Sequence, residues 1–179
     1  MSYLPSREDA SLIDVFRTWP ALARPIHQFG ETLMREDSPF EPGERELIAA
    51  FVSTLNGCEY CHGAHSRAAA HFGLDPELVD QCVEDIESSD VAEKLKPVLH
   101  YCRKLNDRPG EIQREDAKAV FDAGWNETAL CHAALVCGFF NLMNRWVEGL
   151  GIEADPKIMD MAGKMLHEKG YNGISELLE

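Results

Sequence analysis

The sequence predicts an all-α protein, and two observations carry that prediction. Apolar residues recur at spacings of three and four along almost the whole chain, and no long alternating run bounded by hairpin turns interrupts them. Capping residues and glycines then mark where individual helices begin and end. We therefore expect one compact helical bundle, a single domain that covers residues 1–179.

The expected helices follow one another with short connections. They cover residues 8–18, 21–35, 44–55, 58–71, 77–87, 91–106, 113–123, 127–148 and 157–168, with a short turn at 174–178. Pro25 lies inside the second helix, which it is expected to kink or restart. The loops 36–43 and 106–110 are too short to act as flexible linkers, so neither divides the chain.

Helix starts are marked by side chains that can accept a hydrogen bond from the free amides of a helix N-terminus. Asp75 and Asp155 each precede a proline, which suits the first helical position. Asp90 and Asn126 precede two further segments with helical periodicity. The expected stops are the glycines Gly73, Gly124, Gly149 and Gly170.

The segment 127–148 is apolar on most of its circumference. A helix that is apolar all round must be covered on all sides. We therefore expect it to be either the central helix of the domain or a helix that another subunit partly covers. The second alternative predicts a homo-oligomer.

Composition argues against several classes of function. The formal net charge is −14, from 31 acidic and 17 basic residues, a field that repels nucleic acids and anionic lipid surfaces. The most apolar segment, 129–143, is too short and too polar to span a bilayer, and no secretory signal is recognisable at the start. We expect a soluble cytoplasmic protein without nucleic-acid or membrane partners.

The chain contains six cysteines. In a reducing cytosol most of them should be free thiols that pack as small apolar side chains. We expect this core role for Cys82, Cys102, Cys131 and Cys137. Only Cys58 and Cys61 have a local spacing that is informative by itself.

That pair lies in the stretch NGCEYCHGAH, residues 56–65. Asn56 and Gly57 indicate a turn, so a new helix should begin near Cys58. At about 100° per residue, the side chains of Cys58, Cys61 and His65 fall on one narrow stripe.

A cysteine in a first helical turn experiences the positive end of the helix dipole, and a histidine one turn away can accept its proton. Both effects lower a thiol pKa below its usual value of about 8.5. The thiolate is the nucleophile, and the second cysteine can then close a disulfide. The dipole favours Cys58 as the more acidic sulfur, while proximity to His65 favours either cysteine, so which sulfur attacks stays open.

Glu46 lies twelve residues before Cys58, on a helix with an apolar face. A carboxylate near that face is costly to bury unless it has a partner. If the helix folds back after the turn, Glu46 comes to lie over His65, where it would orient and charge the imidazole.

Glu46, eleven intervening residues and Cys58-x-x-Cys61-x-x-x-His65 resemble the signature of the alkylhydroperoxidase D family, within the carboxymuconolactone decarboxylase-like superfamily. The later stretch FNLMNR, residues 140–145, resembles its peroxidase-related branch. The resemblance implies an all-helical antioxidant enzyme, a disulfide reductase or hydroperoxidase, in which these four residues form a proton relay around a redox dithiol.

The same resemblance implies the partners. They are a peroxide or disulfide substrate, an external dithiol reductant and further copies of the chain, in a dimer, trimer or hexamer. Neither a cofactor nor a metal is expected. The decarboxylase branch does not rely on the cysteine pair, so its activity is not carried over.

Three alternatives stay open. Zinc binding could use Cys58, Cys61 and His65 with His62, Cys131 or His132, but no second paired knuckle follows, and the stripe sets the three side chains on one rod rather than around a point. The pair could be purely structural. A third possibility is an activity on a small carbonyl or lactone substrate, with the dithiol kept for stability or regulation.

Overall fold

The computed structural model describes residues 2–177. Over that range the chain forms ten α-helices and two single-turn 3₁₀ segments, without a strand. The α-helices are α1 Leu12–Thr18, α2 Pro20–Arg35, α3 Pro42–Leu55, α4 Glu59–His71, α5 Leu78–Glu84, α6 Lys96–Asp107, α7 Arg114–Asp122, α8 Glu127–Gly149, α9 Pro156–Lys169 and α10 Asn172–Glu176. The predicted all-α fold is confirmed. Residue 178, the end of the expected C-terminal turn, lies outside the described part of the chain.

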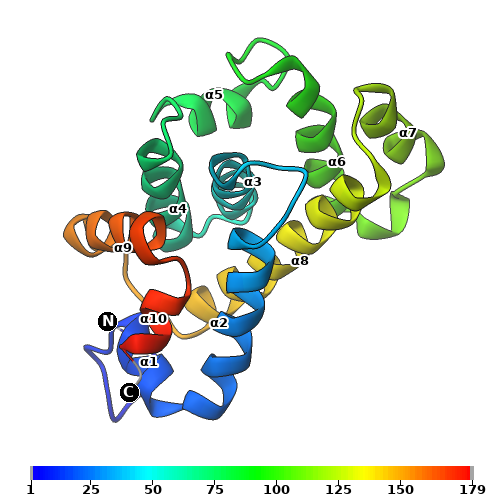
Figure 1. Ribbon diagram of the computed structural model, residues 1–179. Coiled ribbons are helices and arrows are strands. Elements are labelled where there is room, and N and C mark those ends of the chain that lie inside the picture. The colour runs from blue at the N-terminus through cyan, green and yellow to red at the C-terminus, as the bar shows by residue number, and fades with distance from the viewer. Residues whose placement is uncertain (1, 178–179) are drawn as a thin grey trace.

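Helix α3 is the central helix of the bundle. Every residue from Gly43 to Ser53 is buried except Glu44. Figure 1 shows α3 nearly end-on, surrounded by α2, α4, α5, α6 and α8, and it contacts each of them. The residues that precede the Asn56–Gly57 turn are therefore held from all sides, which fixes where α4 begins.

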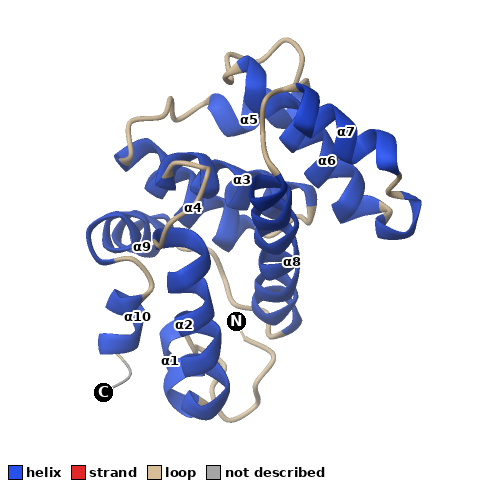
Figure 2. Cartoon of the chain, turned by 45° about the vertical axis from the view of Figure 1, so that its right-hand side comes forward, coloured by secondary structure: helices blue, strands red, loops and turns tan. Residues whose placement is uncertain are grey.

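Helix α8 packs along one side of α3 and α6 rather than through the centre (Figure 2). Its outer face exposes two large apolar side chains, Leu135 at 43% and Leu142 at 47%. The expectation that segment 127–148 forms the central helix is wrong, because α3 occupies that place. Coverage by another subunit stays a prediction.

Most helix boundaries follow the expected capping chemistry. Asn126 caps α8 by accepting from the Ala129 amide, and Asp155 caps α9 by accepting from Lys157 and Ile158. Asp75 accepts from the Glu77 amide at 2.8 Å, in a turn that leads directly into α5. Helix α2 runs from Pro20 to Arg35 without restarting at Pro25.

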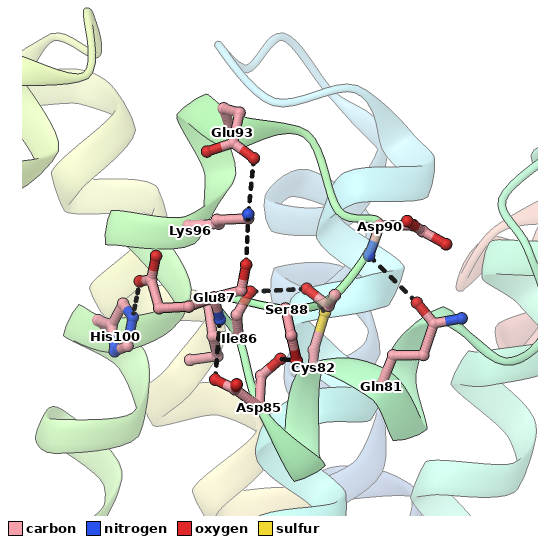
Figure 3. Close-up of polar contacts among 11 residues, drawn as sticks. Gln81, Cys82, Asp85, Ile86, Glu87, Ser88, Asp90, Glu93, Lys96 and His100 are labelled. Atoms are coloured by element: carbon pink, nitrogen blue, oxygen red, sulfur yellow. Dashed lines mark hydrogen bonds and ion pairs between the residues drawn. The ribbon is translucent and has the colours of Figure 1, made fainter.

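The expected start at Asp90 is wrong. The chain instead forms the 3₁₀ segment Glu93–Leu95 before α6 begins at Lys96. Figure 3 shows the reason: the Asp90 amide donates to the Gln81 side chain, and Lys96 Nζ donates to the Glu87 carbonyl at 2.8 Å. These contacts hold residues 85–92 as a loop against α5 and α6.

Of the four glycines expected to end helices, three have a positive φ, namely Gly73, Gly124 and Gly170. Gly149 instead is the last residue of α8, and Gly151 adopts the left-handed conformation, with φ +64°. The left-handed glycine therefore lies two residues later than expected.

Helices α4 and α9 cross at close range because small residues face each other. A Cβ added at Gly163 of α9 would lie 2.6 Å from Cβ of Arg67 and 3.1 Å from the Ala64 carbonyl oxygen. No real Cβ tolerates such contacts, so only glycine lets α9 approach α4 this closely. This crossing sets α9 beside the cysteine motif.

No helix within residues 2–177 is long and apolar enough to cross a membrane.

Candidate active site

The cysteine motif begins at a turn that three asparagines hold in place. Gly57 has φ +69°, which returns the chain from α3 into α4. Asn56 donates to Asn144 of α8 at 2.9 Å and accepts from Asn106 of α6 at 3.0 Å. The turn is therefore anchored to two further helices, and Cys58 follows it as the N-cap of α4.

Both cysteines of the motif are free thiols in the interior, with Cys58 at 0% and Cys61 at 4% exposure. The neighbouring Cys61 thiol and burial together raise the pKa of the Cys58 thiol above its usual value. These two effects act against the helix dipole, so the expectation that Cys58 is the more acidic sulfur stays a prediction.

Glu46 and His65 form a direct pair. Glu46 Oε2 lies 2.5 Å from Nδ1 of His65, and the Glu46 side chain is fully buried. Burial by itself opposes ionisation of Glu46, but the interactions with His65 and Arg35 outweigh it and lower the pKa of this carboxyl. Glu46 is therefore a carboxylate at neutral pH, and it holds His65 with Nε2 as the remaining ring nitrogen.

Arg35, at the end of α2, completes this network and was missed from the sequence. Its Nη2 donates to Glu46 Oε1 at 2.5 Å and to the Leu166 carbonyl of α9 at 2.9 Å. A buried carboxylate requires such a cation. The sequence contains 17 lysines and arginines and no spacing that singles out Arg35, because its partner lies on another helix.

A cavity of about 260 Å³ lies beside Cys61 and His65. Residues of α1, α2, α4, α8, α9 and α10 line it, and its wall is almost entirely apolar, including Met143, Met161 and Met165. Among the described residues, no lysine, arginine, aspartate or glutamate lines it. Cys58 does not line the cavity, so the two thiols differ in their access to a bound molecule.

Aromatic rings fix the imidazole within this wall. The Phe140 ring meets His65 edge-on at 4.5 Å between centroids, and Tyr171 lies nearly parallel to it at 6.5 Å. Tyr171, the residue before α10, is buried. The contact of Tyr171 with His65 could not be predicted from the sequence, because only the crossing of α9 over α4 brings residue 171 to residue 65.

The other four cysteines of the chain, and His62 within the motif, lie apart from this site. Cys82, Cys102 and Cys137 are buried as expected, but Cys131 is exposed on α8, so its expected core role is wrong. His62 turns away from Cys61 and lies 2.7 Å from the Thr54 hydroxyl. Within residues 2–177 no three His, Cys, Asp or Glu side chains are grouped as a metal site requires.

Comparisons with known proteins agree with this fold and motif. Residues 20–90, the segment that contains Glu46, Cys58, Cys61 and His65, match the family model of the carboxymuconolactone decarboxylase family. No curated protein sequence matches the chain.

Solved structures with the same fold include two peroxidase-related proteins. The alkylhydroperoxidase AhpD core protein of Ralstonia eutropha JMP134 has a TM-score of 0.76 and 23% identity, over 84% of this chain and 78% of that one. A peroxidase-related protein of Silicibacter sp. TM1040 has a TM-score of 0.75 and 25% identity, over 82% and 76%.

A third similar structure is the C82A variant of the debrominase Bmp8 in complex with 2,3,4-tribromopyrrole. Its TM-score is 0.69 at 19% identity, over 84% of this chain and 81% of that one. The fold and the matched segment together support a place in the alkylhydroperoxidase D-like, carboxymuconolactone decarboxylase-like family.

Proposed function

We propose that the protein is a thiol-dependent antioxidant oxidoreductase that reduces a hydroperoxide, or exchanges a disulfide, with the Cys58–Cys61 pair. One observation carries the proposal: Cys61 and His65 line the same apolar cavity, and His65 is fixed through Nδ1 by the buried carboxylate of Glu46. A nucleophile, a base and a group that orients the base are the parts that such a reaction needs.

Cys61 is the attacking sulfur in this proposal. It lines the cavity, whereas Cys58 is fully buried, does not line the cavity and has a raised pKa. His65 Nε2 takes the thiol proton of Cys61. The thiolate then attacks the terminal oxygen of the hydroperoxide, the O–O bond breaks, and the alkoxide leaves as an alcohol with the proton that His65 returns.

The product at Cys61 is a sulfenic acid. Cys58, the N-cap residue of the helix that carries Cys61, attacks this sulfur, so that a disulfide forms and water leaves. An external dithiol then reduces the disulfide. In sum, one hydroperoxide and two thiols give one alcohol, one water and one disulfide.

The debrominase neighbour suggests a second candidate, reduction of a halogenated ring. A 260 Å³ apolar cavity beside a thiol suits such a molecule. Two thiols and one carbon–bromine bond would give a carbon–hydrogen bond, hydrogen bromide and the same disulfide. The alternative of a small carbonyl or lactone substrate stays a prediction, because a neutral molecule of this kind needs no charged group on the described cavity wall.

We further propose that the protein works as a homo-oligomer in the cytoplasm. The exposed side chains of Phe29 on α2 and Leu135 on α8 line a common groove, which supports contact with another copy. A reducing compartment supplies the external dithiol.

The test is a turnover assay with cumene hydroperoxide and dithiothreitol, with loss of peroxide as the readout. We expect peroxide consumption that Cys61→Ser abolishes, and a Cys58–Cys61 disulfide in the peptide map of the oxidised wild type. If peroxide oxidises no thiol of the wild type, the hydroperoxide proposal is wrong. Release of bromide from 2,3,4-tribromopyrrole in the same assay would favour the second candidate.

A further inference from the structure

The cavity beside Cys61 contains a second histidine that the relay does not use. His27, on α2, lines the same cavity as Cys61 and His65 and is only 1% exposed. Neither of its ring nitrogens has a hydrogen-bond partner among residues 2–177. Its closest ring contact is the Phe16 ring of α1, edge-on at 4.4 Å.

An unpartnered imidazole in the interior is costly to the fold. A buried polar group that has lost water without gaining a partner is unfavourable, and most such groups in proteins are paired. An apolar side chain would fill this position better. The arrangement is explained if a bound molecule supplies the missing partner.

The chemistry of the wall limits what that molecule can be. The described lining contains no charged side chain of fixed sign, so a carboxylate or an ammonium group would lose its hydration without compensation. Burial lowers the pKa of His27 to about 4, so at neutral pH the ring is uncharged and offers one N–H donor and one nitrogen acceptor.

The size of the cavity limits the molecule further. At about 260 Å³ it exceeds the roughly 150 Å³ of an engineered apolar cavity that holds one benzene. A substituted single ring or a short branched chain therefore fits, whereas a large polar metabolite does not.

We propose that the cavity binds a neutral, largely apolar molecule with one hydrogen-bonding group, such as a hydroxyl, a carbonyl or an N–H, and that His27 recognises this group. This inference rests on the proposed function only in taking the bound molecule to be the substrate of Cys61. His27 is then a specificity residue, and the apolar walls bind the remainder of the substrate.

Tyr171 is the nearest rival for this role. Its hydroxyl is also buried without a hydrogen-bond partner among the described residues, and it lines the same cavity. Its ring, however, packs beside His65 and Arg35, within the relay itself. A test has to separate the two side chains.

The experiment measures binding of two neutral probes of nearly equal shape, p-cresol and p-xylene, to the reduced full chain by NMR titration. Because p-xylene leaves water more readily, the informative quantity is the affinity ratio of p-cresol to p-xylene. We expect this ratio to fall about tenfold in His27→Leu, which corresponds to about 1.4 kcal/mol. Met165→Leu, an apolar exchange in the same wall, should leave the ratio unchanged.

Two results would overturn the proposal. One is an unchanged ratio in His27→Leu, and a collapse in Tyr171→Phe alone would then assign the recognition to Tyr171. The other is binding of 4-methylbenzoate as tight as that of p-cresol. We also expect His27→Leu to unfold at an equal or higher urea concentration than wild type, since a merely structural histidine would make the variant less stable.

The binding test and the redox test fail separately. If peroxide oxidises no thiol but the p-cresol preference depends on His27, the proposed function is wrong and the recognition site stands. If the thiols are oxidised and the preference is absent, only the inference about His27 is wrong.

Discussion

Two buried histidines line one cavity, and their surroundings differ in almost every respect. The Nδ1 atom of His65 on α4 contacts one oxygen of the Glu46 carboxylate, and Arg35 binds the other oxygen. His27 on α2 has an aromatic edge beside it and no hydrogen-bond partner within the described chain. The first imidazole is held in one orientation, and burial keeps the second neutral at pH 7.

The difference indicates two uses of the same side chain. An imidazole beside a buried carboxylate can take up a proton and return it. An imidazole in an apolar wall can only donate and accept hydrogen bonds, because burial lowers the pKa of His27 to about 4. We therefore assign proton transfer to the Glu46 side of the cavity and recognition to the His27 side.

Removing the imidazole of His65 should have the largest effect. His65→Gln keeps a polar side chain but no proton acceptor, so we expect kcat/KM with cumene hydroperoxide to fall by about 10²-fold or more. The matched control is His62→Gln on the same helix, whose side chain faces Thr54 instead of the cavity. Equal losses in the two variants would contradict the assignment.

Removing the charge of Glu46 should destabilise the fold as well as the site. Glu46→Gln leaves the largely buried Arg35 without its counter-ion, and we expect the free energy of unfolding in urea to fall by about 3 kcal/mol. Glu84→Gln, at an exposed carboxylate, should change it by less than about 0.5 kcal/mol.

The same carboxylate predicts a pH dependence in the acid range. Because the pKa of Glu46 is lowered from its ordinary value of 4.5, its contribution to stability is fully present above pH 4.5 and is lost as the pH falls through the lower folded-state value. A Glu46→Gln variant whose stability falls by as much as that of wild type below pH 4.5 would argue against this ion pair.

His27 predicts a second, separate pH dependence. Its pKa is lowered from 6.5 to about 4, so the unfolded chain binds the proton first as the pH falls. Its effect on stability should be absent above pH 6.5 and should grow to a loss of about 3 kcal/mol at pH 4.

Comparison with His27→Leu isolates this loss. The other titratable groups on the cavity wall, which are Tyr60, Cys61, His65 and Tyr171, are present in both proteins and cancel. The measurement is the free energy of urea unfolding at intervals from pH 7 to pH 4. Parallel curves for the two proteins would show that His27 is not held neutral.

Cys131 should have the smallest effect. It is the exposed cysteine of α8 and lies outside the cavity wall. We expect Cys131→Ser to change peroxide turnover by less than about twofold. The folded variant should lack the thiol that reacts fastest with a disulfide reagent in folded wild type. A large loss of turnover would mean that the redox centre includes Cys131.

The local parts of this account could be predicted from the sequence. Glu46, Cys58, Cys61 and His65 lie within twenty residues on two consecutive helices joined by a turn, so helical geometry alone brings them together. The caps at Asn126 and Asp155 could be predicted for the same reason, since a cap and its helix are adjacent in the chain.

The parts that depend on packing between distant helices could not. Arg35, His27 and Tyr171 reach the site only because α2 and α9 fold against α3 and α4. The raised pKa of Cys58 also depends on burial, which the helix dipole argument did not include. The false start at Asp90 has the same origin, because side chains of α5 and α6 hold that loop.

The most direct test of the central claim is to locate the first oxidation product. Cys58→Ser is treated with one equivalent of cumene hydroperoxide in the presence of dimedone, and the labelled peptide is identified by mass spectrometry, with Cys82→Ser as the buried-cysteine control. We predict a dimedone adduct on Cys61 that is absent when His65 is also replaced by Gln. Labelling of Cys58 in the Cys61→Ser variant, with an unlabelled Cys61 in Cys58→Ser, would contradict the account.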